Sequence, residues 1–437
     1  MKRRHLFGAI AGAVAAAALL GGILAGSPSA GPPAQVDPKV AADRLLDGFA
    51  AGDTAAAIER LERRVRENPR DAEGLALLGL AYQQRVRETG DPSLYPSSEK
   101  VLRRSLELVA DNDLAVTGLA ALAASRHRFG DAAALAREAL SLNPYSAPAL
   151  GQLGDASVER GEYKAAFRAF DRMAALKPTA AAYARVAYAR ELLGHTRAAI
   201  AAMKLAVSAA AATPEPAAWS LVELGNLYYN SGRLRPAESA YREALARYPD
   251  YHRAQAALAR LLAAGGELDA AVALYRRAVE AVPLPEHAAG LAETLAAARR
   301  EDEAVAAYEL VEVMQRLLEA NGARTELETA LVDLDRNVEV EDALARVREA
   351  YAERRSIDAD DVLAWALYRN GRCREALRYS DRALRLGTRD ALKHFHRGMI
   401  ERCLGRSTAA RDSFRTALEI NPYFSPRWAP VAKEAVR

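Results

Sequence analysis

The sequence predicts an all-α chain built from repeated helix-turn-helix units, and two patterns carry this prediction. Ala, Leu, Arg and Glu dominate after residue 38, with apolar residues at three- and four-residue spacing and no strand-like alternation. Glycines followed by a polar or small residue interrupt the helical pattern at intervals of 31 to 38 residues. A period of this length is the signature of a repeated helix pair. The glycines are Gly130, Gly161, Gly194, Gly232 and Gly266, and then Gly371 and Gly405.

Composition and charge exclude several broad classes of protein. With 51% hydrophobic and 27% charged residues, the chain is globular, and no Gly/Ser-rich or Pro-rich linker interrupts it after residue 38. The net charge of +3 comes from Lys2, Arg3 and Arg4, because the remaining residues are balanced. Without a long basic stripe, binding of nucleic acid is not expected.

The first 26 residues have the layout of an export signal or a membrane anchor. A short basic segment precedes an uncharged apolar run from Leu6 to Gly26, and small residues follow it. A run of about twenty residues is also long enough to span a bilayer, so an uncleaved anchor stays open as an alternative. Membrane contact would then come through residues 6–26 alone. Either reading places the body of the protein outside the cytoplasm, secreted or tethered to the cytoplasmic membrane.

The rest of the chain divides into a linker, the repeats and a cap. Residues 27–37 form a flexible linker by composition, and Asp37 followed by Pro38 resembles the start of a helix. The repeats are expected over residues 38–424, and residues 425–437 are predicted to form a capping helix over the last apolar face. We count about eleven units, which start near residues 38, 72, 116, 147, 180, 218, 252, 285, 324, 357 and 391.

Within one unit, residues 224–250, the motif becomes specific. Leu224, Gly225 and Tyr228 lie on the predicted first helix, and the second helix carries Ala237, Tyr241, Ala244 and Pro249. In this pattern the chain resembles the tetratricopeptide repeat (TPR) family, which implies a right-handed superhelical solenoid. One small-residue position recurs as Ala166, Ala199, Ala237, Ala271, Ala304, Ala376 and Ala410. The position four residues later recurs as Phe170, Met203, Tyr241, Tyr275, Tyr308 and Phe414.

Three units depart from this pattern. Residues 87–96 look like an insertion, which predicts a protruding loop. In the eighth unit Arg299 and Arg300 replace the turn glycine, and the second helix runs on to Gly322, a candidate joint in the superhelix. The ninth unit, residues 324–356, keeps the helical pattern but little of the motif.

The resemblance implies a concave groove that binds a peptide or a partner helix. Aromatic and Arg side chains suit such interfaces, and they form two patches, one around Trp219 and one around Trp365. The alternative is that these aromatics belong to the interhelix core. The groove positions of the family fall on Tyr188, Trp219, Asn226, Tyr229, Asn230, Arg260, Trp365, Tyr368, Arg369, Phe395, His396, Met399 and Arg402.

A carboxylate clamp of the chaperone-tail type is not supported. Asn226 stands at one position of such a clamp. The other positions are occupied by Val222, Ala257, Glu286 and Gly290.

No catalytic or metal-binding constellation is found, and no cofactor is expected. His394 and His396 would point to nearly opposite sides of a helix, because each residue turns the helix by about 100°. HExxH, a phosphate-binding glycine loop and a nucleophile elbow are all missing from the sequence.

These observations predict a non-catalytic scaffold for protein partners at a bacterial-type cell envelope. Two alternatives stay open: a carrier of a non-protein ligand such as a cell-wall glycan, and a regulatory subunit of an enzyme complex. The family layout also places Cys373 and Cys403, the only cysteines, at one edge of the solenoid. A disulfide is compatible with that layout, and two separate thiols are the alternative.

Overall fold

The computed structural model describes residues 42, 44–47, 50 and 52–437. The predicted signal or anchor (1–26), the linker (27–37) and the expected helix start at residues 37–38 lie outside these ranges. The described residues form helices and turns, with no strand among them, which confirms the predicted all-α repeat solenoid. None of the helices in this part of the chain is long and apolar enough to cross a membrane.

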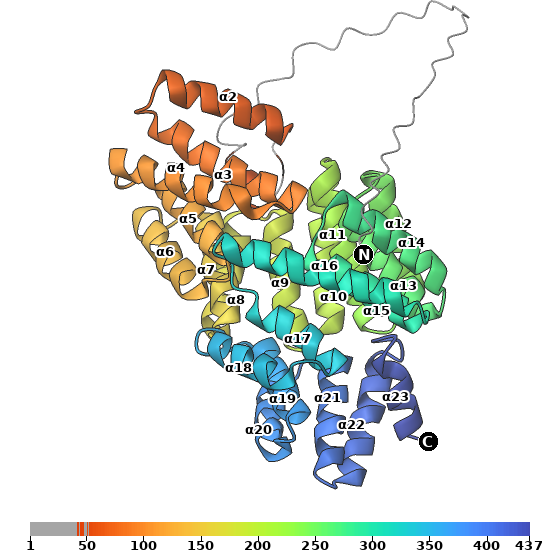
Figure 1. Ribbon diagram of the computed structural model, residues 1–437. Helices are drawn as coiled ribbons and strands as arrows, with labels where there is room; N and C mark the ends of the chain where they lie inside the picture. Colours follow the sequence, from red (N-terminus) through yellow and green to blue (C-terminus); the bar gives the residue numbers. More distant parts are fainter. Residues whose placement is uncertain (1–41, 43, 48–49, 51) are drawn as a thin grey trace, which may run out of the picture. The chain divides into compact units, whose positions relative to one another are not determined.

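Ten consecutive helix pairs form the body of the fold (Figure 1). The first helices of the pairs are α3 (Ala72–Thr89), α5 (Asp113–Ser125), α7 (Ala147–Glu159), α9 (Ala180–Leu192), α11 (Pro214–Asn230), α13 (His252–Gly265), α15 (Pro285–Ala297), α17 (Glu326–Arg336), α19 (Ile357–Arg369) and α21 (Ala391–Cys403). The second helices are α4 (Tyr95–Leu108), α6 (Phe129–Leu142), α8 (Tyr163–Leu176), α10 (Thr196–Ala210), α12 (Leu234–Arg247), α14 (Leu268–Ala281), α16 (Glu301–Ala320), α18 (Val340–Tyr351), α20 (Cys373–Ala383) and α22 (Ser407–Ile420). Helix α2 (Thr54–Glu67) precedes them and α23 (Trp428–Ala435) follows.

Glycines in the left-handed region join the helices within most pairs. Gly232, with φ of 73°, lets its own N–H and that of Arg233 bond to carbonyls at the end of α11. One turn differs from the prediction, and the glycine-free turn of the eighth unit agrees with it. Gly130 lies inside α6, and His127 takes the left-handed conformation there instead. In the eighth unit Arg299 adopts this conformation without a glycine.

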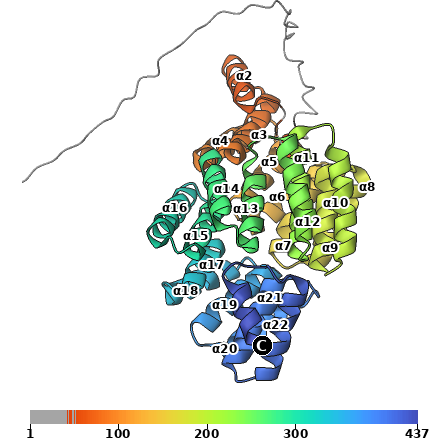
Figure 2. The same ribbon diagram turned by 90° about the vertical axis from the view of Figure 1, so that its right-hand side faces the viewer.

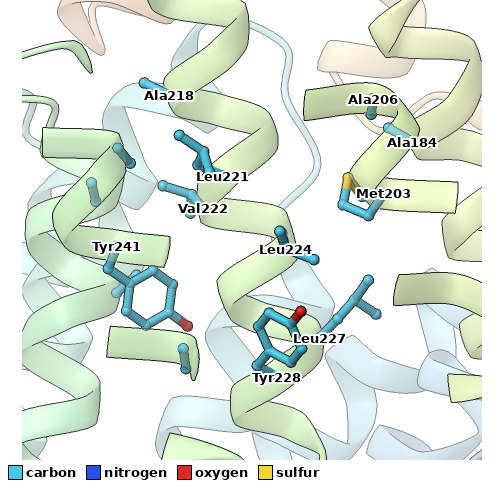
Figure 3. Packing of buried hydrophobic residues seen from close by; sticks show 14 of the residues in the cluster. Ala184, Met203, Ala206, Ala218, Leu221, Val222, Leu224, Leu227, Tyr228 and Tyr241 are labelled. Atoms are coloured by element: carbon cyan, nitrogen blue, oxygen red, sulfur yellow. The ribbon is translucent and has the colours of Figure 1, made fainter. Parts of the chain in front are cut away.

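Close packing of a glycine against an aromatic ring explains the repeated motif. A Cβ atom at Gly225 would overlap the ring of Tyr241, which is fully buried. Gly398 faces Phe414 in the same way. The missing side chain allows the helices to approach, and the ring fills the space beside the crossing. Figure 3 shows Tyr241 in the core formed with Leu221, among others.

Residues 87–96 do not form the protruding loop that the sequence predicts. Residues 92–94 form a short 3-10 helix, η1 (Pro92–Leu94), which Asp91 caps. Gly90 lies against Val282 and Pro283, at the end of a helix nearly two hundred residues later. Gly90 therefore packs against a distant repeat, while Leu94 and Tyr95 pack with Val86 and Leu122 of α3 and α5.

The joint predicted near Gly322 is present. Every other pair of successive helices from α2 to α22 packs closely along the backbone, whereas α17 does not pack in this way on α15 or α16. Gly322 adopts a left-handed φ of 81° just after α16. This break divides the described repeats into an N-terminal array, α2–α16, and a C-terminal array, α17–α23. Figure 2 shows both arrays from a second direction.

Candidate binding cavity

The first helices of three successive repeats enclose a cavity of about 760 Å³. Its walls come mainly from α9, α11 and α13. On α11 the lining residues are Trp219, Glu223, Asn226 and Asn230, spaced three or four apart, so they form one stripe of the helix. The opposite stripe of α11, including Leu221 and Tyr228, is buried in the core (Figure 3). The helical period therefore directs the polar residues into the cavity.

A second cavity of about 350 Å³ adjoins the first. The two share Tyr188, Glu191, Asn230 and Arg260. The second is also lined by residues of the C-terminal array, among them residues 388–393. The two cavities together reach from the N-terminal repeats to the place where the arrays meet.

The predicted groove residues divide into two groups. Six of them line one or both of these cavities: Tyr188, Trp219, Asn226, Tyr229, Asn230 and Arg260. The other seven line neither: Trp365, Tyr368, Arg369, Phe395, His396, Met399 and Arg402.

Asn226 is the centre of a polar network in the cavity wall. Its Oδ1 accepts hydrogen bonds from Nη2 of Arg260 at 2.8 Å and from the hydroxyl of Tyr241 at 2.9 Å. Its Nδ2 donates to Glu223 at 3.3 Å. These bonds hold the amide in one orientation and join three repeat helices.

The Arg260 guanidinium lies over the ring of Tyr229, 4.4 Å from its centroid. Burial alone would lower the pKa of Arg260, but the hydroxyls of Tyr241, Tyr229 and Tyr275 outweigh it and hold the pKa above its ordinary value. Its Nε is buried without a hydrogen-bond partner. Arg260 therefore brings a permanent positive charge to the junction of the two cavities.

Three carboxyl groups on the same walls lie outside the ion pairs found among the described residues. Glu191 accepts a hydrogen bond from Asn230 at 3.1 Å, and Glu215 accepts one from the N–H of Ala50 at 2.9 Å. Within the described residues, neither these two nor Glu223 forms an ion pair. Burial raises the pKa of each of the three above its ordinary value. Arg87 near Glu215, and Arg253 and Arg260 near Glu223, oppose these shifts, so the walls combine acidic groups outside direct ion pairs with arginine charges.

The second patch predicted from the sequence is core, and this corrects its assignment to the groove. Trp365, Phe395 and His396 are fully buried. Trp365 Nε1 donates to Asp335 at 2.9 Å, and the ring of His396 stacks on the indole at a centroid distance of 4.1 Å. Trp428 of α23 stacks against Phe395 at 5.4 Å. The last helix therefore covers these positions.

The remaining predicted residues of this patch support the same core. Tyr368 stacks on Trp365 at 4.9 Å, and Arg369 lies over the same indole at 5.5 Å. Arg402 donates to the sulfur of Met399 at 3.1 Å. Met399 is buried, Tyr368 and Arg369 are half-buried beside the indole, and Arg402 is exposed, so Arg402 lies at the surface of the C-terminal array and outside both cavities.

The two cysteines pair across neighbouring repeats. Cys373, at the start of α20, and Cys403, at the end of α21, form a disulfide with a Cα–Cα distance of 6.3 Å. This geometry is the one that the family layout allowed.

A buried histidine pair joins α13 to α15, and no motif in the sequence indicated it. His252 Nδ1 lies 2.8 Å from His287 Nε2. Burial lowers the pKa of His252 to about 3 and that of His287 to about 4, so both are neutral near pH 7. Their spacing of 35 residues, about one repeat, is the signal that could have suggested contact.

In the part of the chain that the structure describes, no group of three His, Cys, Asp or Glu residues could hold a metal ion.

Comparison with known proteins supports the repeat assignment. A family model described as tetratricopeptide repeat matches residues 222–284 and 362–423. Among solved structures, a thermophilic TPR protein from Thermus thermophilus is 21% identical, with a TM-score of 0.39, covering 44% of this chain and 98% of that one. YrrB, a TPR protein with an unusual peptide-binding site, is 18% identical, with a TM-score of 0.29, covering 42% and 93%.

One further structure is matched over most of its length. The Cut9–Hcn1 assembly contributes a chain that is 12% identical, with a TM-score of 0.39, covering 92% of this chain and 97% of that one. No curated protein matches this chain. The two segments matched by the family model are therefore similar to tetratricopeptide repeats, and the helix pairs and the glycine–aromatic packing agree with this similarity.

Proposed function

We propose that this protein is a non-catalytic interaction scaffold that binds a peptide segment of a partner protein in the cavity of α9, α11 and α13. The observation that carries the proposal is the stripe of Trp219, Glu223, Asn226 and Asn230, which faces a cavity of about 760 Å³ instead of another helix. This volume lies within the range of roughly 300–1,000 Å³ typical of ligand pockets. Tetratricopeptide repeat proteins act as interaction scaffolds, and YrrB has a peptide-binding site.

The polar groups of the walls suit a peptide. A peptide backbone presents both donors and acceptors. The guanidinium of Arg260, which lines both cavities, can attract a carbonyl, and the carboxyl groups of Glu191 and Glu223 can accept from N–H groups. Trp219 and Tyr188 add aromatic surface, which is favoured at the centre of interfaces.

A location at the cell envelope belongs to the same proposal. It rests on the basic and apolar segment of residues 1–26. The disulfide between Cys373 and Cys403 supports it, because such bonds persist mainly in oxidising compartments outside the cytoplasm. Fractionation of cells that express a tagged full-length chain tests the location, and recovery of the protein in the cytoplasm alone would refute it.

Selection from a displayed library of random peptides tests the binding site. We expect the native protein to enrich a family of related peptides, and we expect Arg260→Ala to bind them at least about tenfold more weakly by calorimetry, because the buried cation and its donor are lost. Arg242→Ala is the matched control, since Arg242 is an exposed arginine on the second helix α12. Equal binding by all three proteins would reject the cavity. Binding of cell-wall glycan fragments without any peptide would favour the carrier alternative.

A further inference from the structure

The two arrays meet along a line of turns that we call the seam. On one side are turns of the N-terminal array, and on the other are connections of the C-terminal array. The N–H of Arg324 donates to the carbonyl of Arg126 at 3.1 Å. One repeat further along, the N–H of Arg355 donates to the carbonyl of Glu159 at 2.8 Å. Each contact joins residues nearly two hundred positions apart.

The seam continues through the next repeats. A Cβ atom at Gly194 would overlap the carbonyl of Gly387, so the two backbones touch there. Beyond it, Asn421 Nδ2 donates to the carbonyl of Tyr229 at 2.9 Å, and the hydroxyl of Tyr229 donates to the carbonyl of Tyr423 at 2.7 Å. The seam therefore consists largely of hydrogen bonds between turns.

Three apolar side chains of the C-terminal array pack against cores of the N-terminal array: Ile357, which is buried, and Leu386 and Val332, which are partly buried. Ile357, which is 1% exposed, is the only C-terminal residue among the buried members of a core cluster formed by α7, α8 and α9, which includes Val158 and Phe170. Its N–H also donates to the hydroxyl of Tyr163 at 2.6 Å. Beside it, Arg354 forms an ion pair with Glu159 at 3.1 Å. By contrast, a large apolar core holds each array together internally.

The connection between the arrays is suited to act as a hinge. Helix α17 lacks the close backbone packing on α16 that joins other successive helices, and Gly322 has a left-handed backbone between them. Near this point, Arg336 of α17 covers the ring of Tyr308 at 4.1 Å. Rotation at the hinge would break hydrogen bonds that water can replace and would withdraw Ile357 and the partly buried Leu386, while the buried members of each array's main core stay in place.

Opening of the seam would expose the binding cavity. The second cavity lies between the arrays: Tyr188 and Glu191 line it from one side, and Asp358, Ala391 and Lys393 line it from the other. It shares residues with the first cavity. The C-terminal array thus forms one wall of the space that leads to the proposed site.

We propose that the C-terminal array is a gate, which swings about residues 321–325 and admits a peptide to the cavity when the seam opens. The inference rests on the proposed function and adds how binding is regulated. Partner binding either follows the breaking of the seam contacts or competes with those contacts. The gate can be tested without any peptide, so its failure is distinct from failure of the binding site.

The sequence contains a matched pair of residues for this test. Asn421 and Asn143 both precede a Pro-Tyr dipeptide at the end of a second helix. The amide of Asn421 donates across the seam to Tyr229, whereas that of Asn143 donates to Asp113 within the N-terminal array. Substitution of each by Ala removes the same group from two equivalent turns, but only one of these turns belongs to the seam.

The readout is the rate at which a small thiol reagent modifies a cysteine introduced as Ala391→Cys. Ala391 is 5% exposed and lines the second cavity. In this background we expect Asn421→Ala to raise the modification rate several-fold and Asn143→Ala to leave it unchanged. Equal rates in all three proteins would overturn the gate, and so would an equal increase in both variants.

A second pair of variants distinguishes opening of the seam from local unfolding of the C-terminal array. Ile357→Ala removes the buried apolar anchor of the seam, whereas Val347→Ala removes similar atoms from the core of α18 within the C-terminal array. We expect the modification rate to rise with Ile357→Ala only, with unchanged helical circular dichroism in both. A greater increase with Val347→Ala would mean that the array unfolds locally, which would also overturn the gate.

Discussion

Residues 222–284 and 362–423 match the same repeat model, yet they use their concave positions in opposite ways. Alignment of their turn glycines, Gly232 with Gly371, places Asn226 opposite Trp365. Asn226 lines a cavity, whereas Trp365 is fully buried. The helices α11 and α19, which carry these two residues, end at aligned positions, Asn230 and Arg369, although α11 begins one turn earlier.

The difference between Asn226 and Trp365 depends on the element that covers the concave face. The helix that follows the second segment is α23, whose Trp428 packs on Phe395 and Trp365. The helix that follows the first segment is α15, and it leaves the face of α11 open to the cavity. Family motifs specify the packing within and between repeats, and the concave positions remain free to become either core or binding site.

The largest expected effect is the difference in stability between variants at the two aligned positions, Trp365 and Asn226. Trp365→Ala should lower the free energy of unfolding by about 3–5 kcal/mol, because it leaves a large cavity in the core. Asn226→Ala should cost about 1–3 kcal/mol, because Tyr241 and Arg260 each lose a partner. Urea unfolding followed by circular dichroism measures both. Equal costs would contradict the contrast between core and cavity.

The next largest effect is expected on removal of the disulfide, which is present in the second segment only. Cys373 and Cys403 are bonded, whereas the aligned residues of the first segment, Leu234 and Ala264, make apolar contacts with the core there. Replacing both cysteines by Ser should cost about 2–4 kcal/mol, because the cross-link restricts the unfolded chain. Unfolding with and without reductant measures this cost. If reductant also lowers the stability of the double variant, which has no cysteines, then the loss of stability has a source other than this disulfide.

Glu293 on α15 makes stability depend on pH. Burial first, and then the charge of Asp335, raise the pKa of Glu293 from 4.5 to about 7, while Arg427 opposes this shift. The folded state therefore binds more protons than the unfolded state between these two values, so the free energy of unfolding falls as pH rises through this window. The loss should be at most about 3 kcal/mol.

The equivalent position on α23, the helix that follows the second segment, sharpens this prediction. Glu293 aligns with Ala432 of α23, which is fully buried and cannot titrate. Glu293→Gln should remove most of the decline in stability between pH 4.5 and about 7, measured by urea unfolding across this range. A decline that persists in the variant would assign the effect to other carboxyl groups.

The smallest expected effects on the free energy of unfolding come from conservative substitutions of Arg260 and its aligned residue, Met399. Arg260→Lys should cost about 1 kcal/mol in the free energy of unfolding, because lysine cannot reproduce both the hydrogen bond to Asn226 and the planar contact with Tyr229. Met399→Leu conserves volume in the core and should cost less than about 1 kcal/mol. Thermal unfolding of both variants measures the difference, and a larger cost for Met399→Leu would reverse the comparison.

Much of the fold follows from local patterns in the sequence. The helix pairs, the joint near Gly322 and the pairing of Gly225 with Tyr241 were all predictable, because each depends on residues within one repeat or on its neighbours. Gly130 was misread as a turn residue, because His127 can also adopt the left-handed conformation at low cost. Three of the predicted groove residues, Trp219, Asn226 and Asn230, line the cavity for the same local reason, because they occupy one stripe of α11.

The sequence by itself determined the repeat, its period and the inward or outward face of each helix, since these depend on spacing along a helix of fixed geometry. Tertiary structure alone decided that Trp365 is core, that Gly90 packs against Val282, and that Ile357 anchors the seam. The physical reason is the same in each case. Small rotations between successive repeats accumulate along the solenoid, so contacts between residues nearly two hundred positions apart depend on the sum of many local angles, which no single motif encodes.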